Sequence, residues 1–247
     1  NSNNFNVGFT LSRNSTDNPL FPRSGSDFSF QLTLTPPYSL FDGKNYEGLA
    51  TNYNSSTYDK EAQEKYRWLE YHKWMFRFRT YTALSSSLKH CPVIMTRTDF
   101  GIVGAYNKHR KSPFETFYVG GDGMTGYSTY GQETIALRGY ENGSIAGNST
   151  GNAYAYTRLG LELRYPLMLE ASTNIYALGF LEAGNAWTDV SKMNPFSLRK
   201  SAGVGVRLFL NFIGLMGIDW AYGFDKYGPS GQKIGGSHFH FILGQEF

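Results

Sequence analysis

The feature that most constrains this chain is an alternation of apolar and polar residues that returns nine times along its 247 residues. In one clear case, Leu159, Leu161 and Leu163 alternate with Gly160 and Glu162. Successive side chains of a β-strand point to opposite faces, so each such segment predicts a strand with one apolar face. The nine predicted strands run approximately over residues 5–11, 27–34, 73–79, 93–106, 158–165, 173–187, 203–210, 216–225 and 238–244.

The links between these strands alternate in length, and the face opposite each apolar stripe is charged or rich in glycine. Short links fall near residues 85–92, 166–173 and 211–212, whereas long ones cover residues 37–67, 107–152 and 188–198. Bacterial outer-membrane barrels have short periplasmic turns, long extracellular loops and a polar lumen. The pattern therefore predicts an all-β protein, an antiparallel transmembrane β-barrel.

Three features of the pattern leave this prediction open. Soluble β-sandwiches and jelly rolls also alternate, and the pattern alone does not say which face meets solvent. The link over residues 14–25 is longer than the others on the short side. Single-chain bacterial barrels have even strand numbers, so nine strands predict that further strands lie outside this chain.

Composition narrows the class of protein. Aromatic residues make up 17% of the chain, charged residues 17%, and glycine occurs 28 times. Outer-membrane barrels need aromatic girdles at both interfaces and glycine where strands bend. A net charge of +3 is too small to predict a nucleic-acid partner, and no apolar run reaches the roughly 18 residues of a transmembrane helix. The single Cys91 forms no internal disulfide. The sequence opens at Asn1 without a signal peptide, and because an outer-membrane barrel must be exported, we expect a mature fragment.

Several short motifs occur in the links and late strands. The longest link contains the run Phe117-Tyr118-Val119-Gly120-Gly121, followed by Leu137-Arg138-Gly139-Tyr140 after an insert over residues 122–136. This pair of runs is similar to the signature of the sixth extracellular loop in the BamA family of barrel-assembly factors. Phe21-Pro22-Arg23-Ser24-Gly25 resembles a periplasmic turn of the family and explains the longer link there. The runs over residues 160–166 and 180–187 resemble its acidic late strands, and the ending over residues 239–247 resembles its last strand.

The resemblance runs from about Asn4 to Phe247 and implies the last nine strands of a sixteen-stranded barrel. Residues 1–247 would then be the C-terminal part of a barrel domain, with a long extracellular loop over about residues 107–152. The first strands and the periplasmic POTRA domains expected of the family are absent from this chain. The implied location is the outer membrane of a Gram-negative bacterium.

The loop motif also predicts a site. Glu162 and Glu182 fall on the predicted lumen face, where a loop folded inward would place Arg138 against them, because guanidinium groups suit carboxylates. Gly139 would let the backbone approach the wall, and Tyr140 completes the motif. Removal of Arg138 is then expected to leave two acidic groups facing each other. Without the resemblance, an arginine exposed in solvent would be the simpler interpretation.

For function, the resemblance implies an assembly factor that helps client β-barrel proteins fold and insert through a seam at its last strand. Phe239, Phe241 and Leu243 would anchor this strand in lipid, Gly244 would allow a bend, and Phe247 is the terminal aromatic residue. The implied partners are outer-membrane lipid, unfolded client proteins and accessory assembly lipoproteins. No cofactor is expected, since client folding supplies the free energy.

Other functions remain as alternatives. A protein-export transporter of the same superfamily shares the loop motif, and a passive porin or a barrel enzyme would belong to a different class. Gly121 to Gly126 matches G-x-G-x-x-G, but no helical pattern follows it. His238 and His240 share a strand face without an evident third metal ligand, and no sugar cleft accompanies Glu162 and Glu182. The sequence therefore predicts a protein that is not an enzyme.

Overall fold

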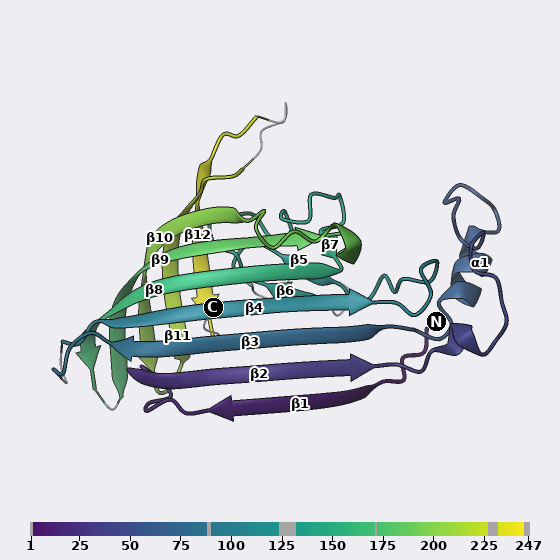
Figure 1. Cartoon of the computed structure of the whole chain (residues 1–247). Helices are drawn as coiled ribbons and strands as arrows, with labels where there is room; N and C mark the ends of the chain where they lie inside the picture. Colours follow the sequence, from purple (N-terminus) through teal and green to yellow (C-terminus); the bar gives the residue numbers. More distant parts are fainter. Residues whose placement is uncertain (1, 88–89, 124–131, 171, 227–231, 245–247) are drawn as a thin grey trace.

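The protein forms one large antiparallel sheet with a smaller sheet beside it (Figure 1). A computed structural model describes residues 2–87, 90–123, 132–170, 172–226 and 232–244. Each of the nine predicted segments is a strand, and each strand pairs with the next one in sequence order of the large sheet. These strands are β1 (Val7–Asn14), β2 (Ser24–Leu34), β3 (His72–Ala83), β4 (Val93–Gly104), β8 (Ala155–Leu169), β9 (Thr173–Trp187), β10 (Arg199–Leu210), β11 (Gly214–Gly223) and β12 (Gly236–Leu243).

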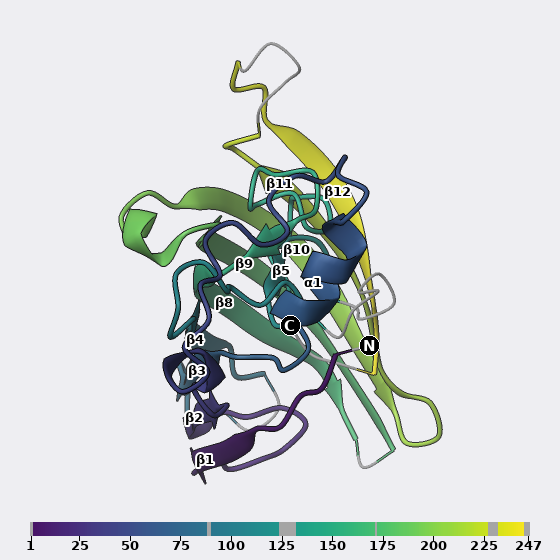
Figure 2. The same cartoon turned by 90° about the vertical axis from the view of Figure 1, so that its right-hand side faces the viewer.

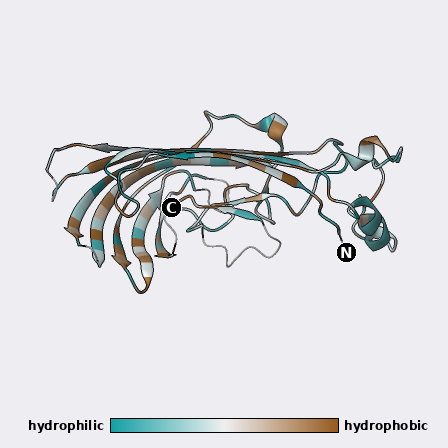
Figure 3. Cartoon of the chain, turned by 90° about the horizontal axis from the view of Figure 1, so that it is seen from below, coloured by the Kyte–Doolittle hydropathy of each residue, from teal (hydrophilic) through white to brown (hydrophobic). Residues whose placement is uncertain are grey.

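The large sheet is strongly curved, and its two outer strands do not meet. Figure 3 shows it as a curved trough, and in Figure 2 strand β5, from the chain between β4 and β8, lies on the concave side. In the described part of the chain, β1 and β12 each have one strand neighbour, so the sheet is not closed. The antiparallel curved sheet confirms the predicted all-β class, whereas a closed transmembrane barrel and its sixteen strands stay predictions.

The links alternate in length as the sequence predicted. At one end of the sheet the links cover residues 15–23, 84–92, 170–172 and 211–213. At the other end they cover residues 35–71, 105–154, 188–198 and 224–235. All long excursions therefore leave the sheet at the same end, which is the arrangement typical of outer-membrane barrels.

The two faces of the sheet differ in polarity as predicted. On the convex face the apolar side chains of the alternating segments are exposed or half-buried: Val204, Val206, Leu208, Leu210, Met216, Ile218, Trp220 and Phe224. On the concave face the charged side chains that alternate with such apolar residues are buried: Arg158, Glu162, Arg164, Arg207 and Asp219. An exposed apolar face with buried charges opposite is the reverse of a soluble sandwich, whose apolar faces pack together.

The long links contain short elements that no periodicity in the sequence predicts. The link over residues 35–71 holds the 3-10 helix η1 (Tyr38–Leu40) and the helix α1 (Tyr58–Lys65), and the link over residues 188–198 holds η3 (Val190–Lys192). The small sheet lies in the link over residues 105–154 and consists of β5 (Phe117–Val119), β6 (Glu133–Ile135) and β7 (Asn152–Ala153). In the described ranges, no helix is both long enough and apolar enough to cross a membrane.

The exposed apolar face leads to a first prediction. Val204 is 58% exposed near the middle of β10, so we expect Val204→Lys to destabilise the intact protein in lipid vesicles by about 2–4 kcal/mol. Phe196, 93% exposed in the link over residues 188–198, provides the control, and Phe196→Lys should cost far less. Urea unfolding measures both variants. Equal losses would show that this face does not contact lipid.

Candidate functional site: a loop docked on the concave wall

The link over residues 105–154, the lumenal loop, folds back onto the concave face of the large sheet, which we call the wall. Its central strand β5 pairs in parallel with β6 and antiparallel with β7. Phe117 of β5 is fully buried and packs edge-on against Tyr156 of β8, with ring centroids 4.7 Å apart. The loop and the wall thus share one apolar core, which also contains Val119, Leu137 and Tyr140. This core places the residues that follow Leu137 directly over the wall.

Arg138 lies in this position and contacts both predicted carboxylates. Its backbone N–H donates to Glu182 Oε2 at 2.9 Å, and its Nε and Nη2 donate to Glu182 Oε1 at 3.1 and 2.8 Å. Nη2 also donates to Glu162 Oε1 at 2.6 Å. Arg138 is 0% exposed, so these contacts replace its hydration completely. The predicted ion pairs are present.

Two further partners of Arg138 were not predicted. Its Nη1 donates to Asp219 Oδ2 on β11 at 3.1 Å, and its guanidinium carbon lies 3.5 Å from the ring centroid of Phe180 on β9. Arg138 therefore joins the lumenal loop to β8, β9 and β11. Burial opposes the charged form of Arg138, but the carboxylates of Glu182, Glu162 and Asp219 outweigh it and raise the pKa above its usual value.

Each of these carboxylates also has an arginine from the wall. Arg158 Nη2 donates to Glu182 Oε1 at 2.7 Å, and Arg164 Nε donates to Glu162 Oε2 at 2.9 Å. Arg207 donates to both oxygens of Asp219, at 2.6 and 2.9 Å. Loss of Arg138 is expected to leave Glu162 and Glu182 facing each other, and the structure adds that each would keep its wall arginine. The wall is already paired, and Arg138 adds the contact between wall and loop.

The next two motif residues fit the wall closely. Gly139 has a φ of +88°, and an added Cβ would lie 3.0 Å from both Gly223 N and the Ser201 side chain. Its N–H donates to His240 Nε2 on β12 at 2.8 Å. The Tyr140 hydroxyl donates to the Lys200 carbonyl on β10 at 2.6 Å. The motif as a whole therefore contacts every strand from β8 to β12.

A second contact ties the lumenal loop to the other side of the wall. Glu133 of β6 accepts from Arg77 Nη2 at 2.8 Å and lies 3.6 Å from Lys73 Nζ, both on β3. Glu115 lies 3.9 Å from the same lysine. The loop thus presents carboxylates to β3 and a guanidinium group to β8, β9 and β11. Glu133 belongs to no sequence motif, since it lies within the insert over residues 122–136.

The last strand lies as predicted, except that it stays bonded to β11 through Gly244. Phe239, Phe241 and Leu243 are exposed on the convex face, while His240 and Ile242 are buried on the concave side. Gly244 has a φ of +73°, which fits the predicted change of direction. Its N–H still donates to the Leu215 carbonyl at 2.7 Å, so the chain remains attached to β11 through this residue. Phe247 lies outside the described residues.

Comparison with known proteins then decides the family. A family model described as the Omp85 superfamily domain matches residues 1–247. The chain belongs to the Omp85 superfamily. No curated protein matches it by sequence.

The fold of this Omp85 domain is similar to a solved structure, the crystal structure of BamA from Haemophilus ducreyi lacking POTRA domains 1–3. The TM-score is 0.58 and the sequence identity 18%. The match covers 96% of this chain and 42% of the other, so this domain spans less than half the length of that protein. At this identity the likeness concerns the fold alone.

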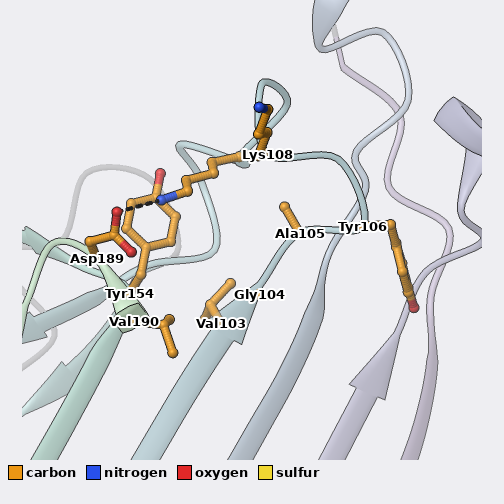
Figure 4. Close-up of a pocket in the computed structure, with 9 residues that line it drawn as sticks. Val103, Gly104, Ala105, Tyr106, Lys108, Tyr154, Asp189 and Val190 are labelled. Atoms are coloured by element: carbon orange, nitrogen blue, oxygen red, sulfur yellow. Dashed lines mark hydrogen bonds and ion pairs between the residues drawn. The ribbon is translucent and has the colours of Figure 1, made fainter. Parts of the chain in front are cut away.

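Other candidate sites in the Omp85 domain receive less support. The described residues hold no group of three or more His, Cys, Asp or Glu side chains able to bind a metal ion. Part of the G-x-G-x-x-G run, residues 124–126, lies outside the described residues. A pocket of about 420 Å³ lies at the end of β4 between Val103, Tyr106, Tyr154 and Val190 (Figure 4). There Lys111 Nζ lies 3.3 Å from Asp189, which indicates a structural ion pair at the rim.

Substitution of Gly139 tests whether the close contact between its backbone and the wall holds the lumenal loop in place. We expect Gly139→Ala to loosen the lumenal loop, because the methyl group adds contacts at 3.0 Å to a backbone strain of about 1–2 kcal/mol. Gly147→Ala carries the same kind of strain, with a φ of +70°, but meets no atom within 4 Å. Limited proteolysis of the loop compares the two variants. If both are cleaved equally, contact with the wall at Gly139 is unimportant.

Proposed function

We propose that this domain forms part of an outer-membrane barrel that helps client β-barrel proteins fold and insert. Membership of the Omp85 superfamily and a BamA-like fold support this role and a bacterial outer-membrane location. The observation that carries the proposal furthest is the docked motif of the lumenal loop. Arg138 holds three strands of the wall, and the next residue, Gly139, donates to His240 on the last strand. The loop motif and the last strand therefore form one connected unit.

The last strand supplies the surface for a client. One edge of β12 pairs with β11 from Gly236 to Leu243, and the other edge has no strand neighbour in the described part of the chain. Exposed edges are normally blunted by charge or proline, but Phe239 to Gly244 contains no proline and no lysine, arginine, aspartate or glutamate. An unfolded client strand would add to this edge through main-chain hydrogen bonds. Burial of the client's own strands supplies the free energy, so the role needs no cofactor and no catalytic residue.

Reconstitution tests this role. Intact protein in lipid vesicles should speed the folding of an unfolded outer-membrane barrel by at least about tenfold, equal to a barrier lower by about 1.4 kcal/mol. The shift in gel mobility of folded barrels measures the rate. Vesicles with an unrelated porin at equal density provide the control, because any barrel disturbs lipid packing. Equal rates in the two preparations would refute the proposal.

Export of a partner protein is the alternative within the superfamily, and passive diffusion is the alternative outside it. The lumenal loop lies on the concave side with contacts to both β3 and β8–β11, so a chain passing through the lumen would have to displace it. Exporters deliver their partner to the far side of the vesicle, whereas an insertase leaves it in the membrane. Protease protection and flotation of the client distinguish the two results, and vesicle conductance identifies a porin.

A further inference from the structure

A buried arginine on the wall has hydrogen-bond donors that no protein group satisfies. Arg97 on β4 is 3% exposed, and its Nε and Nη2 have no hydrogen-bond partner among the protein atoms. A guanidinium group without partners is costly to bury. Arg97 lies on the same concave face as the site of Arg138. Among the described residues, it forms no hydrogen bond or ion pair with the loop motif or with the three carboxylates that bind Arg138.

The neighbouring carboxylates do not neutralise Arg97. Asp99 is its closest acidic partner in the described ranges, with Oδ2 at 3.9 Å from Nε, and the same oxygen lies 3.9 Å from Arg158 Nη1. Both distances exceed those of a hydrogen bond. Glu162 is diagonal to Arg97 in the β4–β8 register, but its oxygens accept from Arg138 and Arg164. The acidic groups near Arg97 are therefore shared or already engaged.

The opposite neighbour of Arg97 adds a second positive charge. Arg79 on β3 lies directly opposite Arg97 in the register and on the same face. Like charges in this position repel each other. On the other side, Arg97 lies opposite Gly160, where an added Cβ would meet only the Arg97 Cβ, at 3.5 Å. Arg79 and Arg97 are thus neighbours on the same face of the sheet, next to a position that carries no side chain.

We propose that Arg79 and Arg97 bind a small inorganic anion on the concave wall. Paired guanidinium groups present N–H donors suited to chloride or to the oxygens of phosphate. The burial of Arg97 favours an anion of this size over a larger acidic ligand. The bound anion would separate the two like charges and accept from the unsatisfied donors of Arg97. It stabilises the wall beside the site of the lumenal loop.

Thermal unfolding of the intact protein in detergent micelles tests this proposal. At constant ionic strength in sodium gluconate, replacement of gluconate by chloride or phosphate should raise the unfolding temperature in a saturable way, since a ligand of the folded state stabilises it. Arg97→Gln should abolish the rise and, in gluconate alone, should unfold no earlier than the unaltered protein. Arg13→Gln removes an exposed arginine from β1 and should keep the rise.

The response to each anion identifies the ligand or overturns the proposal. A rise with phosphate alone indicates an oxyanion site, and a rise with both anions indicates a general small-anion site. No rise with either anion, or an equal rise in Arg97→Gln, contradicts the proposal. If Arg97→Gln does not fold, crystals of the unaltered protein grown in bromide decide the matter. An anomalous peak between Arg79 and Arg97 supports the site, and its absence there overturns it.

Discussion

Replacing Arg138 by glutamine should release the lumenal loop and lower client folding by at least about tenfold. Glutamine cannot reach the three carboxylates that the guanidinium group of Arg138 bridges at 2.6–3.1 Å. Breaking buried ion contacts of this kind costs about 3–5 kcal/mol. The wall should stay folded, because Glu162, Glu182 and Asp219 each keep a wall arginine. Protease cleavage of the loop and client folding rates measure the two effects.

Two companion variants make this result specific. Arg138→Lys should fail to restore activity, since a single ammonium group cannot reproduce the forked contacts or the stacking on Phe180. Lys44→Gln removes one partner of an ion pair with Glu64 whose side chains are both 51% exposed, so it should be almost neutral. An Arg138→Gln protein with a protease-resistant loop and full activity would show that the loop does not depend on this residue.

Joining the last strand to the first barrel strand of the intact protein by a disulfide should stop client insertion, and reduction should restore it. The expected loss is at least about tenfold, since the client would lose the edge to which it adds. A disulfide between β11 and β12, placed at the paired positions Tyr222 and Ser237, is the matched control. It links two strands that already pair and should leave activity intact. If the protein with the first disulfide inserts clients at an unchanged rate, the last strand is only a structural part of the wall.

The strands were predictable because a single local rule, alternation of polarity, operates in each of them. The same rule placed Arg158, Glu162 and Asp219 on the concave face, where they are buried. Their partners were harder to predict from sequence, since the pairing of Arg138 with Asp219 joins positions 81 residues apart. The pairing of Arg138 with Glu162 and Glu182 was predictable only through the resemblance of the loop motif.

The elements within the long links could not be predicted from local pattern. β5 and β6 have three residues each and β7 has two, too few for a periodicity to appear. Their pairing depends on a core that includes Tyr156 and Val103 from the wall. The contact of Glu133 with Arg77 and Lys73 depends in turn on that pairing. Such contacts follow from the tertiary fold, and the sequence carries no separate signal for them.

The coupling free energy between Arg138 and Glu182 tests the central claim most directly, that one arginine docks the lumenal loop on the wall. Urea unfolding of four proteins in lipid vesicles gives this value: the unaltered protein, Arg138→Met, Glu182→Gln and the double variant. Two side-chain hydrogen bonds join Arg138 to Glu182 in a fully buried setting, so we expect a coupling of about 2–3 kcal/mol. A coupling within about 0.5 kcal/mol of zero, the value usual for independent sites, would contradict the account.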